Sequence, residues 1–327
     1  NGDRLTLRSE LIAVESGQTP LAANDVIVVS GGARGVTAAT TIKLAESSGA
    51  TFVLLGRSEV QDEPASCVDA IDDAAIKRTL LEAATLAGDD LTPRQLSAQV
   101  DRVLNSREIR STLETIASVG GRGIYRTVDI TDRAAVAVVL TEVRGTIGPI
   151  TGVVHGAGVL ADKVIAEKTN EQFDAVFSTK VTGLKTLLDL TITDSLKLLC
   201  LFSSVAARTG NLGQSDYAMA NEVLNKVAIA EQTRRGPGCV VKALGWGPWA
   251  GGMVTPELKR HFESMGVTLI PLGAGATMFV DEIASAQTDQ VEVVLGGGVL
   301  VSGSANGSNS TLSQRADDSR IGAEVGA

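Results

Sequence analysis

Aromatic residues are scarce in this chain of 327 residues: they make up 3% of it, although hydrophobic residues make up 44%. The core must therefore consist of Val, Leu, Ile and Ala, which is typical of buried parallel strands covered by helices. The three cysteines, Cys67, Cys200 and Cys239, are far apart and lack CxxC spacing. This spacing indicates neither a disulfide framework nor a zinc site, so we predict no metal and a reducing, cytoplasmic location.

Positive charge is also in deficit, since 29 Lys and Arg against 38 Asp and Glu give a formal net charge of −9. This balance repels nucleic-acid backbones and anionic membrane surfaces. No apolar run approaches 18 residues and no signal-peptide pattern opens the sequence, so we expect no nucleic-acid partner and no membrane. The first residue is Asn rather than Met, and we interpret the chain as a segment of something longer.

Strand-like apolar runs alternate with helical patterns, which is the signature of βαβ units and a parallel sheet. Seven strands are expected, at 26–29, 51–55, 123–129, 152–155, 196–202, 240–244 and 291–295. We therefore predict an α/β fold of the Rossmann type, with a doubly wound, seven-stranded and mainly parallel sheet.

About 65 residues separate the second and third expected strands, far more than the dozen or so of a minimal crossover. Helix starts at Asp72-Asp73 and Thr92-Pro93 predict a helical insertion at 59–122. The insertion either packs as an enlarged crossover on the sheet edge or serves as a docking element or lid.

The ends of the chain are expected to lie outside the main domain, which we place at 25–300. Residues 1–24 contain one possible strand, LTLRSELIAVE, and read as a linker or the remnant of a preceding subdomain. Residues 301–327 are poor in large apolar side chains and cannot offset the entropy of ordering, so we predict a flexible tail.

The stretch VIVVSGGARGVTAAT places Gly31, Gly32 and Gly35 between a strand and a helix. Glycines let the backbone approach a pyrophosphate, and the helix N-terminus supplies N–H donors. Thr37 stands where a third glycine is usual, which tightens helix packing without closing the phosphate site. The flanking strand and helix favour a nucleotide site over a merely structural turn.

The second expected strand ends at Gly56-Arg57-Ser58, where an NAD enzyme would offer a carboxylate to the adenosine ribose. A guanidinium instead grips a 2′-phosphate with two hydrogen bonds. We therefore predict NADPH, with Arg34 as a second nearby cation; the alternative is that Arg57 is a solvated loop charge. Asp129 is placed to contact adenine, while His155, in the HGAG loop, is expected to pack and hydrogen-bond rather than transfer protons.

Ser204 precedes Tyr217 by about a dozen residues, and Asn221 follows Tyr217 at the i+4 position on a helix. This constellation resembles the short-chain dehydrogenase/reductase superfamily and, more narrowly, the ketoreductase domains of polyketide synthases and polyunsaturated fatty acid synthases. The resemblance covers roughly residues 25–300. Its motifs are SGGARGVTA (30–38), LLGRS (54–58), HGAGVL (155–160), FSTKVTGLKTLL (177–188), FSSVAARTGNLGQSDYAMAN (202–221) and GWGPWAGGM (245–253).

The resemblance implies that Lys180, from the preceding helix, supplies the cation that Asn221 does not. A phenol has an ordinary pKa near 10, and a nearby ammonium makes it a better acid toward a developing alkoxide. Ser204 then hydrogen-bonds the ketone oxygen, and Asn221 holds a water or Lys180. Taken singly, Tyr217 could instead be a core residue, Ser204 a strand end and Lys180 a surface lysine.

The predicted site comprises four catalytic residues and a larger cofactor-binding set. The catalytic residues are Lys180, Ser204, Tyr217 and Asn221. The cofactor-binding residues are Ser30, Gly31, Gly32, Arg34, Gly35, Val36, Arg57, Ser58, Asp129, Ile130, His155, Gly156, Ala157, Gly158, Lys180, Tyr217 and Pro248.

Substrate and stereochemistry are expected to depend on Asp162 and Met253. Leu160-Ala161-Asp162 retains two members of the Leu-Asp-Asp triplet that the resemblance associates with a D-configured alcohol. Thr209 stands where ketoreductases of the opposite class have a tryptophan. Residues 255–266 read as an amphipathic lid helix or, alternatively, a plain surface helix.

The resemblance implies NADPH-dependent reduction of a β-ketoacyl thioester that an acyl carrier protein presents on its phosphopantetheine arm. Other megasynthase domains in the same polypeptide would be further partners. Two alternatives stay open: a stand-alone reductase of small ketones or free acyl thioesters, and a non-catalytic NADPH-binding structural domain.

Overall fold

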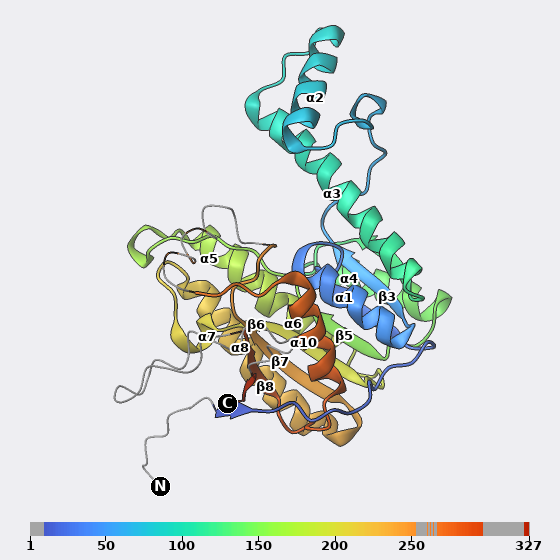
Figure 1. The fold of residues 1–327 in the computed structure, drawn as a ribbon, viewed down its shortest axis with the longest axis vertical. Helices are drawn as coiled ribbons and strands as arrows, with labels where there is room; N and C mark the ends of the chain where they lie inside the picture. The colour runs from blue at the N-terminus through green and yellow to red at the C-terminus, as the bar shows by residue number, and fades with distance from the viewer. Residues whose placement is uncertain are drawn as a thin grey trace.

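The computed structural model describes residues 10–252, 260, 262, 264, 267–296 and 324–326. Its centre is a sheet with the strand order β1-β9-β8-β7-β6-β5-β2-β3-β4 (Figure 1). The strands β2 to β8 pair in parallel throughout. They are β2 (Val26–Ser30), β3 (Thr51–Gly56), β4 (Arg122–Thr127), β5 (Gly152–His155), β6 (Leu198–Ser204), β7 (Val240–Trp246) and β8 (Glu292–Leu295). The predicted seven-stranded parallel sheet of the Rossmann type is confirmed.

Two short antiparallel strands extend the sheet beyond β8, so that it has nine strands rather than the seven predicted. Strand β1 (Glu10–Ile12) lies within the N-terminal segment where a strand was possible, and β9 (Glu324–Gly326) pairs with both β1 and β8. Of the predicted tail, 301–327, only residues 324–326 lie within the described part of the chain, where they form β9. Three-residue edge strands leave no period-two pattern long enough to find in a sequence.

Helices cover both faces of the sheet, because alternate residues of each strand point to opposite sides. Ile27 and Val29 of β2 pack in one core and Val26 and Val28 in the other. The first core includes residues of α1 (Gly35–Ser48), α3 (Pro93–Ser118) and α10 (Leu272–Ala284); the second includes residues of α4 (Arg133–Thr146), α6 (Gly183–Leu190) and α8 (Ser215–Arg235). The fold is therefore doubly wound.

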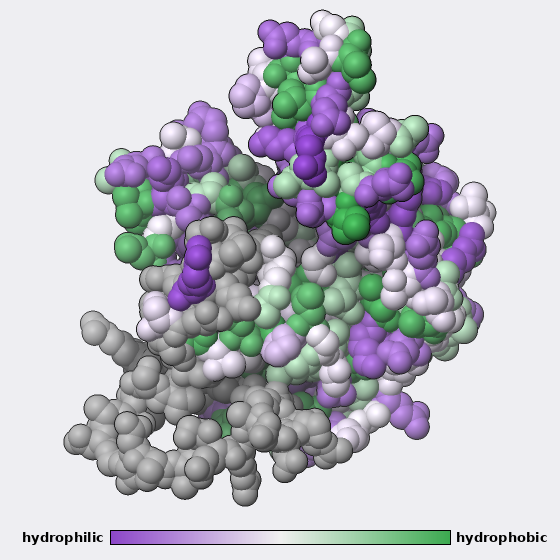
Figure 2. Space-filling model, turned by 45° about the horizontal axis from the view of Figure 1, so that its top comes forward, coloured by the Kyte–Doolittle hydropathy of each residue, from purple (hydrophilic) through white to green (hydrophobic). Residues whose placement is uncertain are grey.

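The insertion between β3 and β4 contains a 3-10 turn (Ala65–Cys67), α2 (Asp73–Ala87) and α3. The side chains of Asp72 and Thr92 cap the two helices at the expected positions. The C-terminal half of α3 packs on the main core through Ile109 and Ile116. Its N-terminal half joins α2 in a separate small core that includes Ile76 and projects from the body (Figure 1). Hydrophilic and hydrophobic residues mix on this projecting end (Figure 2).

None of the described helices has the length and apolar character needed to cross a membrane. Cys67, Cys200 and Cys239 are all buried and unpaired. Among the described residues, no group of three or more His, Cys, Asp or Glu side chains is arranged to hold a metal ion.

Candidate active site

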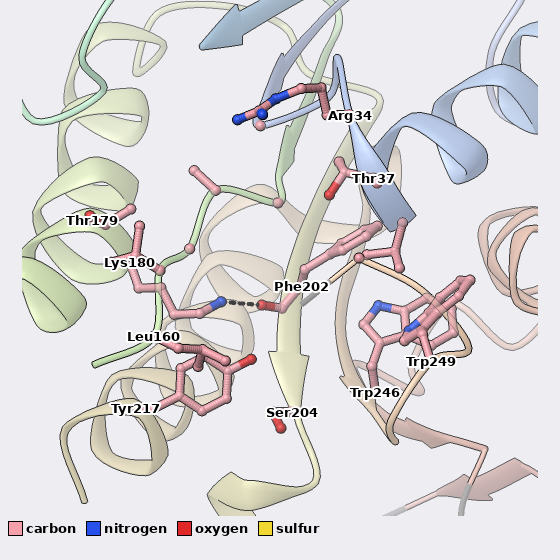
Figure 3. Close-up of a pocket in the computed structure, with 18 of the residues that line it drawn as sticks. Arg34, Thr37, Leu160, Thr179, Lys180, Phe202, Ser204, Tyr217, Trp246 and Trp249 are labelled. Carbon is pink, nitrogen blue, oxygen red and sulfur yellow. Dashed lines mark hydrogen bonds between the residues drawn. The ribbon is translucent and has the colours of Figure 1, made fainter. Parts of the chain in front are cut away.

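A cleft with a volume of about 730 Å³ opens at the carboxyl ends of the central strands. Residues at or just after the ends of β2, β3, β5, β6 and β7 line it, including Gly31, Gly56, Gly156, Ser204 and Trp246. Open parallel sheets bind ligands at this edge. The volume lies within the usual range of ligand pockets, roughly 300–1,000 Å³. Figure 3 shows part of the cleft, with side chains converging from both halves of the sheet.

The glycine turn connects β2 to α1 along one wall of the cleft. Gly31 has a φ of +71°, and a Cβ there would lie 3.0 Å from the backbone of Ala157, so only glycine fits. Gly31, Arg34, Gly35 and Val36 line the cleft. Of the predicted cofactor residues in this turn, Ser30 and Gly32 do not line it: Ser30 is fully buried, and Gly32 packs against Val29.

Thr37, at the position where a third glycine is usual, is buried against the loop after β5. A Cβ on Gly156 would lie 2.5 Å from Cγ2 and 2.6 Å from Oγ1 of Thr37. The threonine therefore takes the space that a side chain at Gly156 would need. The cleft beside them remains open, since both residues line it.

His155 is buried and connects the end of β2 to the turn that carries Lys180. Its Nδ1 is 2.7 Å from Oγ of Ser30, and its Nε2 is 2.9 Å from the backbone oxygen of Lys180. Burial, helped by the nearby positive charge of Lys180, lowers the pKa of His155 to about 3. The imidazole is therefore neutral at pH 7 and does not line the cleft; its geometry is that of a structural bridge.

Four of the predicted cofactor residues line the cleft after the ends of β3 and β4: Arg57, Ser58, Asp129 and Ile130. The Asp129 carboxylate accepts hydrogen bonds from the backbone N–H and the hydroxyl of Thr131, at 2.8 and 2.7 Å. Burial raises the pKa of Asp129, but these bonds and the charge of Arg57 outweigh burial and hold it below its ordinary value. Asp129 is thus ionised, and the exposed Arg57 is the cation beside it.

Lys180 lies in a π-helical turn, Ser178–Thr182, between α5 (Asn170–Phe177) and α6. Such turns occur frequently at functional sites. Its side chain is buried, with Nζ donating a hydrogen bond of 2.8 Å to the backbone oxygen of Phe202 and lying 5.5 Å from the centroid of the Tyr217 ring (Figure 3). Burial lowers the pKa of Lys180 to about 8. The cation therefore does arrive from a neighbouring helix.

Tyr217 lies in the first turn of α8 and lines the cleft. Burial raises the pKa of its phenol above the ordinary value of 10.0, and hydrogen bonds involving the side chains of Asn221 and Ser204 lower it without cancelling the effect of burial. The charge of Asp162 raises the pKa further. The sequence predicted that the ammonium of Lys180 makes the phenol more acidic. In the structure burial has the larger effect on the pKa of Tyr217, so the phenol stays protonated at neutral pH.

Ser204 and Asn221 both lie near Tyr217. Ser204 ends β6 and lines the cleft, and its Oγ accepts a hydrogen bond from the Ala206 N–H at 3.1 Å. Asn221 is fully buried and does not line the cleft; its Nδ2 donates to the Tyr217 backbone oxygen at 2.8 Å. The Oδ1 of Asn221 has no partner among the described residues. A buried acceptor of this kind usually has a partner, so a water or an ammonium fits there.

The predicted substrate residues fall at the edge of the described site. Asp162 is exposed and accepts a hydrogen bond of 2.8 Å from Nε2 of Gln214, which lines the cleft together with Leu160. Pro248, one of the predicted cofactor residues, also lines the cleft. Met253 lies outside the described residues, as does most of the expected lid helix, although Phe262 is described and lines the cleft.

Sequence reasoning assigned no role to a buried ion pair beneath Tyr217. The Lys168 Nζ lies 2.7 Å from Oδ2 of Asp216 and donates to the Ala161 backbone oxygen at 2.8 Å. The other carboxylate oxygen of Asp216 accepts from the Tyr217 N–H at 2.9 Å. The pair thus ties the loop before Asp162 to the start of α8. Its members are 48 residues apart, and no local pattern relates them.

An aromatic cluster lies at the GWGPWAGGM segment, from which only Pro248 and Met253 were predicted as site residues. Trp246 packs on Trp249, with ring centroids 4.7 Å apart, and Phe202 packs on Trp246 at 5.7 Å. All three line the cleft. The sequence does indicate this cluster, because both tryptophans of an aromatic-poor chain fall in GWGPW.

A doubly wound parallel sheet with a glycine turn and a Ser, Tyr and Lys in one cleft defines a reductase of the short-chain dehydrogenase/reductase class. A family model described as "KR domain" matches residues 26–251. The chain therefore belongs to the KR domain family, the ketoreductases, which are oxidoreductases of this class.

The relatives are large synthases. Over 284 residues the chain is 42% identical to one subunit of the polyunsaturated fatty acid synthase of Thraustochytrium sp. (strain ATCC 26185 / S-3), an alignment that covers 84% of this chain and 10% of that protein. It is 35% identical over 175 residues to erythronolide synthase EryA2 of Saccharopolyspora erythraea, covering 53% of this chain and 5% of that protein. The chain thus spans a tenth or less of the length of these relatives.

Solved structures of similar fold include ketoreductases and short-chain dehydrogenases. A ketoreductase domain from the bacillaene assembly line is 26% identical, with a TM-score of 0.63, and the match covers 86% of this chain and 58% of that one. A short-chain dehydrogenase from Mycobacterium paratuberculosis bound to NAD shares the fold at 17% identity, with a TM-score of 0.59 over 84% of this chain and 96% of that one.

Proposed function

We propose that the chain reduces a β-ketoacyl thioester, carried on an acyl carrier protein, to the D-configured β-hydroxyacyl thioester, with NADPH as the reductant. The observation that carries the proposal is the meeting of Tyr217, Ser204 and Lys180 in one cleft whose other end holds the glycine turn and Arg57. The KR family membership supports the reaction type.

The residues present fit a dinucleotide. The turn at Gly31 leaves no Cβ between the backbone and the cleft, and the N-terminus of α1 follows it, as pyrophosphate binding requires. Arg57 and Ser58 would hold the 2′-phosphate, and Asp129-Ile130 the adenine. The backbone at Gly156–Gly158, together with Lys180, Tyr217 and Pro248, would border the nicotinamide half. When bound, NADPH supplies the hydride.

Tyr217 is the proton donor in this proposal. Its raised pKa keeps the phenol protonated, and an alkoxide is far more basic than a phenolate, so transfer to the developing alkoxide is favourable. The Ser204 hydroxyl hydrogen-bonds the ketone oxygen and fixes its position. The ammonium of Lys180, held near the ring by Phe202, stabilises the phenolate that remains.

The D-configured product rests on the residues beside Tyr217. Leu160 lies next to the Tyr217 ring (Figure 3), and Gln214, which also lines the cleft, donates a hydrogen bond to Asp162. Thr209 also lines the cleft and is much smaller than the tryptophan of the opposite class. These features support entry of the acyl chain from the Leu160 side.

The acyl carrier protein and other synthase domains in the same polypeptide are proposed partners, because the similar proteins are large synthases. We place the catalytic domain at 25–300. This extent includes all the residues proposed to act on substrate or cofactor.

The direct test measures NADPH consumption with β-ketoacyl thioesters of increasing length, each as a carrier-bound and a free thioester. We expect turnover that is faster with carrier-bound substrate, abolished by Tyr217→Phe, and yielding the D-alcohol on chiral analysis. Equal rates for free thioesters favour a stand-alone reductase. No turnover despite NADPH binding would indicate a structural domain, and undiminished turnover by Tyr217→Phe would remove the proton-donor assignment.

A further inference from the structure

The insertion helix α3 lies directly against the glycine turn. The Thr112 hydroxyl donates a hydrogen bond of 3.0 Å to the backbone oxygen of Ala33, and a carboxylate oxygen of Glu108 accepts from the Gly35 N–H at 2.8 Å. One turn earlier, the Asn105 side-chain oxygen accepts from Arg34. Residues three and four apart share one face of a helix, so a continuous face of α3 forms a wall of the cofactor site.

The loop that follows Arg57 and Ser58 is fastened to the same helix. The Gln61 N–H donates to Oγ of Ser106 at 3.2 Å, and its backbone oxygen accepts from Arg110 at 2.7 Å. Glu63 forms an ion pair with Arg107, which also donates to the Ala70 backbone oxygen at 2.6 Å. The end of β3 and α3 are therefore held in a fixed relation to each other.

A hollow of about 400 Å³ lies between these two elements. It is lined by Arg57, Ser58, Glu59, Gln61, Arg102 and Asn105. Arg57 and Ser58 also line the main cleft, so the hollow continues the cleft from its adenosine end. Arg102 lies one helical turn before Asn105, on the face of α3 that bears the contacts to the glycine turn.

The hollow brings together two guanidinium groups in a chain of net charge −9. Neither Arg57 nor Arg102 forms an ion pair with another residue that the structure describes, and both are exposed. Like charges on one hollow repel each other, and a phosphate dianion between them would remove that repulsion. The carboxylate of Glu59 opposes an anion there, but the two guanidinium groups outweigh it.

We propose that Arg102 is a second arginine of the 2′-phosphate site, so that the insertion helix is part of the cofactor-binding site and helps select NADPH over NADH. The planar guanidinium forms paired hydrogen bonds with phosphate oxygens. This inference rests on the proposed use of NADPH. It assigns the insertion a direct role in ligand binding in place of packing alone.

The test is equilibrium binding of NADPH and NADH, followed by nicotinamide fluorescence, to the full chain and to Arg102→Gln. Arg94→Gln is the matched control, because Arg94 is an exposed arginine on the same helix that does not line the hollow. We expect Arg102→Gln to weaken NADPH binding about tenfold, as loss of a hydrogen bond to a charged group does, and to leave NADH binding unchanged. Arg94→Gln should change neither.

Adenosine 2′,5′-bisphosphate and 5′-AMP provide a second pair of probes without the nicotinamide. We expect the Arg102→Gln loss to fall on the bisphosphate alone. A wild-type chain that binds NADPH and NADH equally would overturn the NADPH proposal itself. A wild-type preference that is unchanged in Arg102→Gln would overturn only the role of Arg102, as would equal weakening of both cofactors.

Discussion

The ammonium of Lys180 lies 5.5 Å from the centroid of the Tyr217 ring, and burial lowers its pKa to about 8. The phenol of Tyr217, whose pKa is raised above 10, remains protonated across the same range. Loss of the ammonium, rather than of the phenolic proton, should therefore set the alkaline limit of the reaction. We expect kcat to fall as the pH rises through about 8.

The measurement is the pH dependence of kcat at saturating NADPH and substrate. Lys180→Met, which removes the charge, should lower kcat by about 100-fold or more, the scale of general acid catalysis. Its circular dichroism spectrum should remain that of the wild type. An alkaline limb at pH 10 or above would instead point to Tyr217 as the titrating group.

The buried pair of Lys168 and Asp216 should matter for both stability and catalysis. Removing one partner leaves an unpaired buried charge, so Asp216→Asn is expected to lower the free energy of unfolding by about 3 kcal/mol. Because Asp216 also accepts from the Tyr217 N–H, kcat should fall as well. Chemical denaturation and initial rates measure the two effects.

The double variant Lys168→Met with Asp216→Asn provides the control for this pair. It removes both charges. Its loss of unfolding free energy should therefore be smaller than the sum of the losses of the two single variants, by a coupling energy of about 0.5–3 kcal/mol. Strictly additive losses would show that the two side chains do not act as a pair.

Thr37 stands where a third glycine is usual, and it packs against Gly156 in the loop after β5. Gly156→Ala places a methyl group 2.5 Å from Thr37 Cγ2, and overpacking of this kind costs about 1–3 kcal/mol. Adding Thr37→Ala removes both close atoms and leaves the Thr37 Cβ, which lies 3.2 Å away. We expect the double variant to recover NADPH affinity and thermal stability that Gly156→Ala loses; no recovery would contradict the packing argument.

Local patterns in the sequence predicted most of the fold. The seven parallel strands follow from apolar runs such as residues 26–29. The roles proposed for Tyr217 and Ser204 came from the family resemblance, and the structure brings both residues into one cleft. The cation at Lys180 required the family resemblance, since a π-helical turn and a contact across helices leave no periodic signal.

Contacts between distant segments could not be predicted in the same way. Thr112 is 79 residues from Ala33, and Glu108 is 73 residues from Gly35. Helix α3 was expected from its capping residues, but the direction of its polar face depends on how Ile109 and Ile116 pack on the sheet. Likewise, burial determines the pKa of Tyr217, and burial is a property of the folded chain.

His155 should make the protein sensitive to mild acid. Its pKa is about 3 in the folded chain and about 6.5 when unfolded, so the unfolded state binds more protons between these values. The free energy of unfolding should therefore fall with decreasing pH below 6.5, by about 1.4 kcal/mol per pH unit. Between pH 6.5 and 5 most carboxylates stay ionised, which isolates this contribution. Urea denaturation between pH 5 and 6.5 should show this dependence of the unfolding free energy on pH in the wild type but not in His155→Gln. The variant His261→Gln measures the contribution of the other histidine. If the dependence persists in His155→Gln, the acid sensitivity arises from other groups.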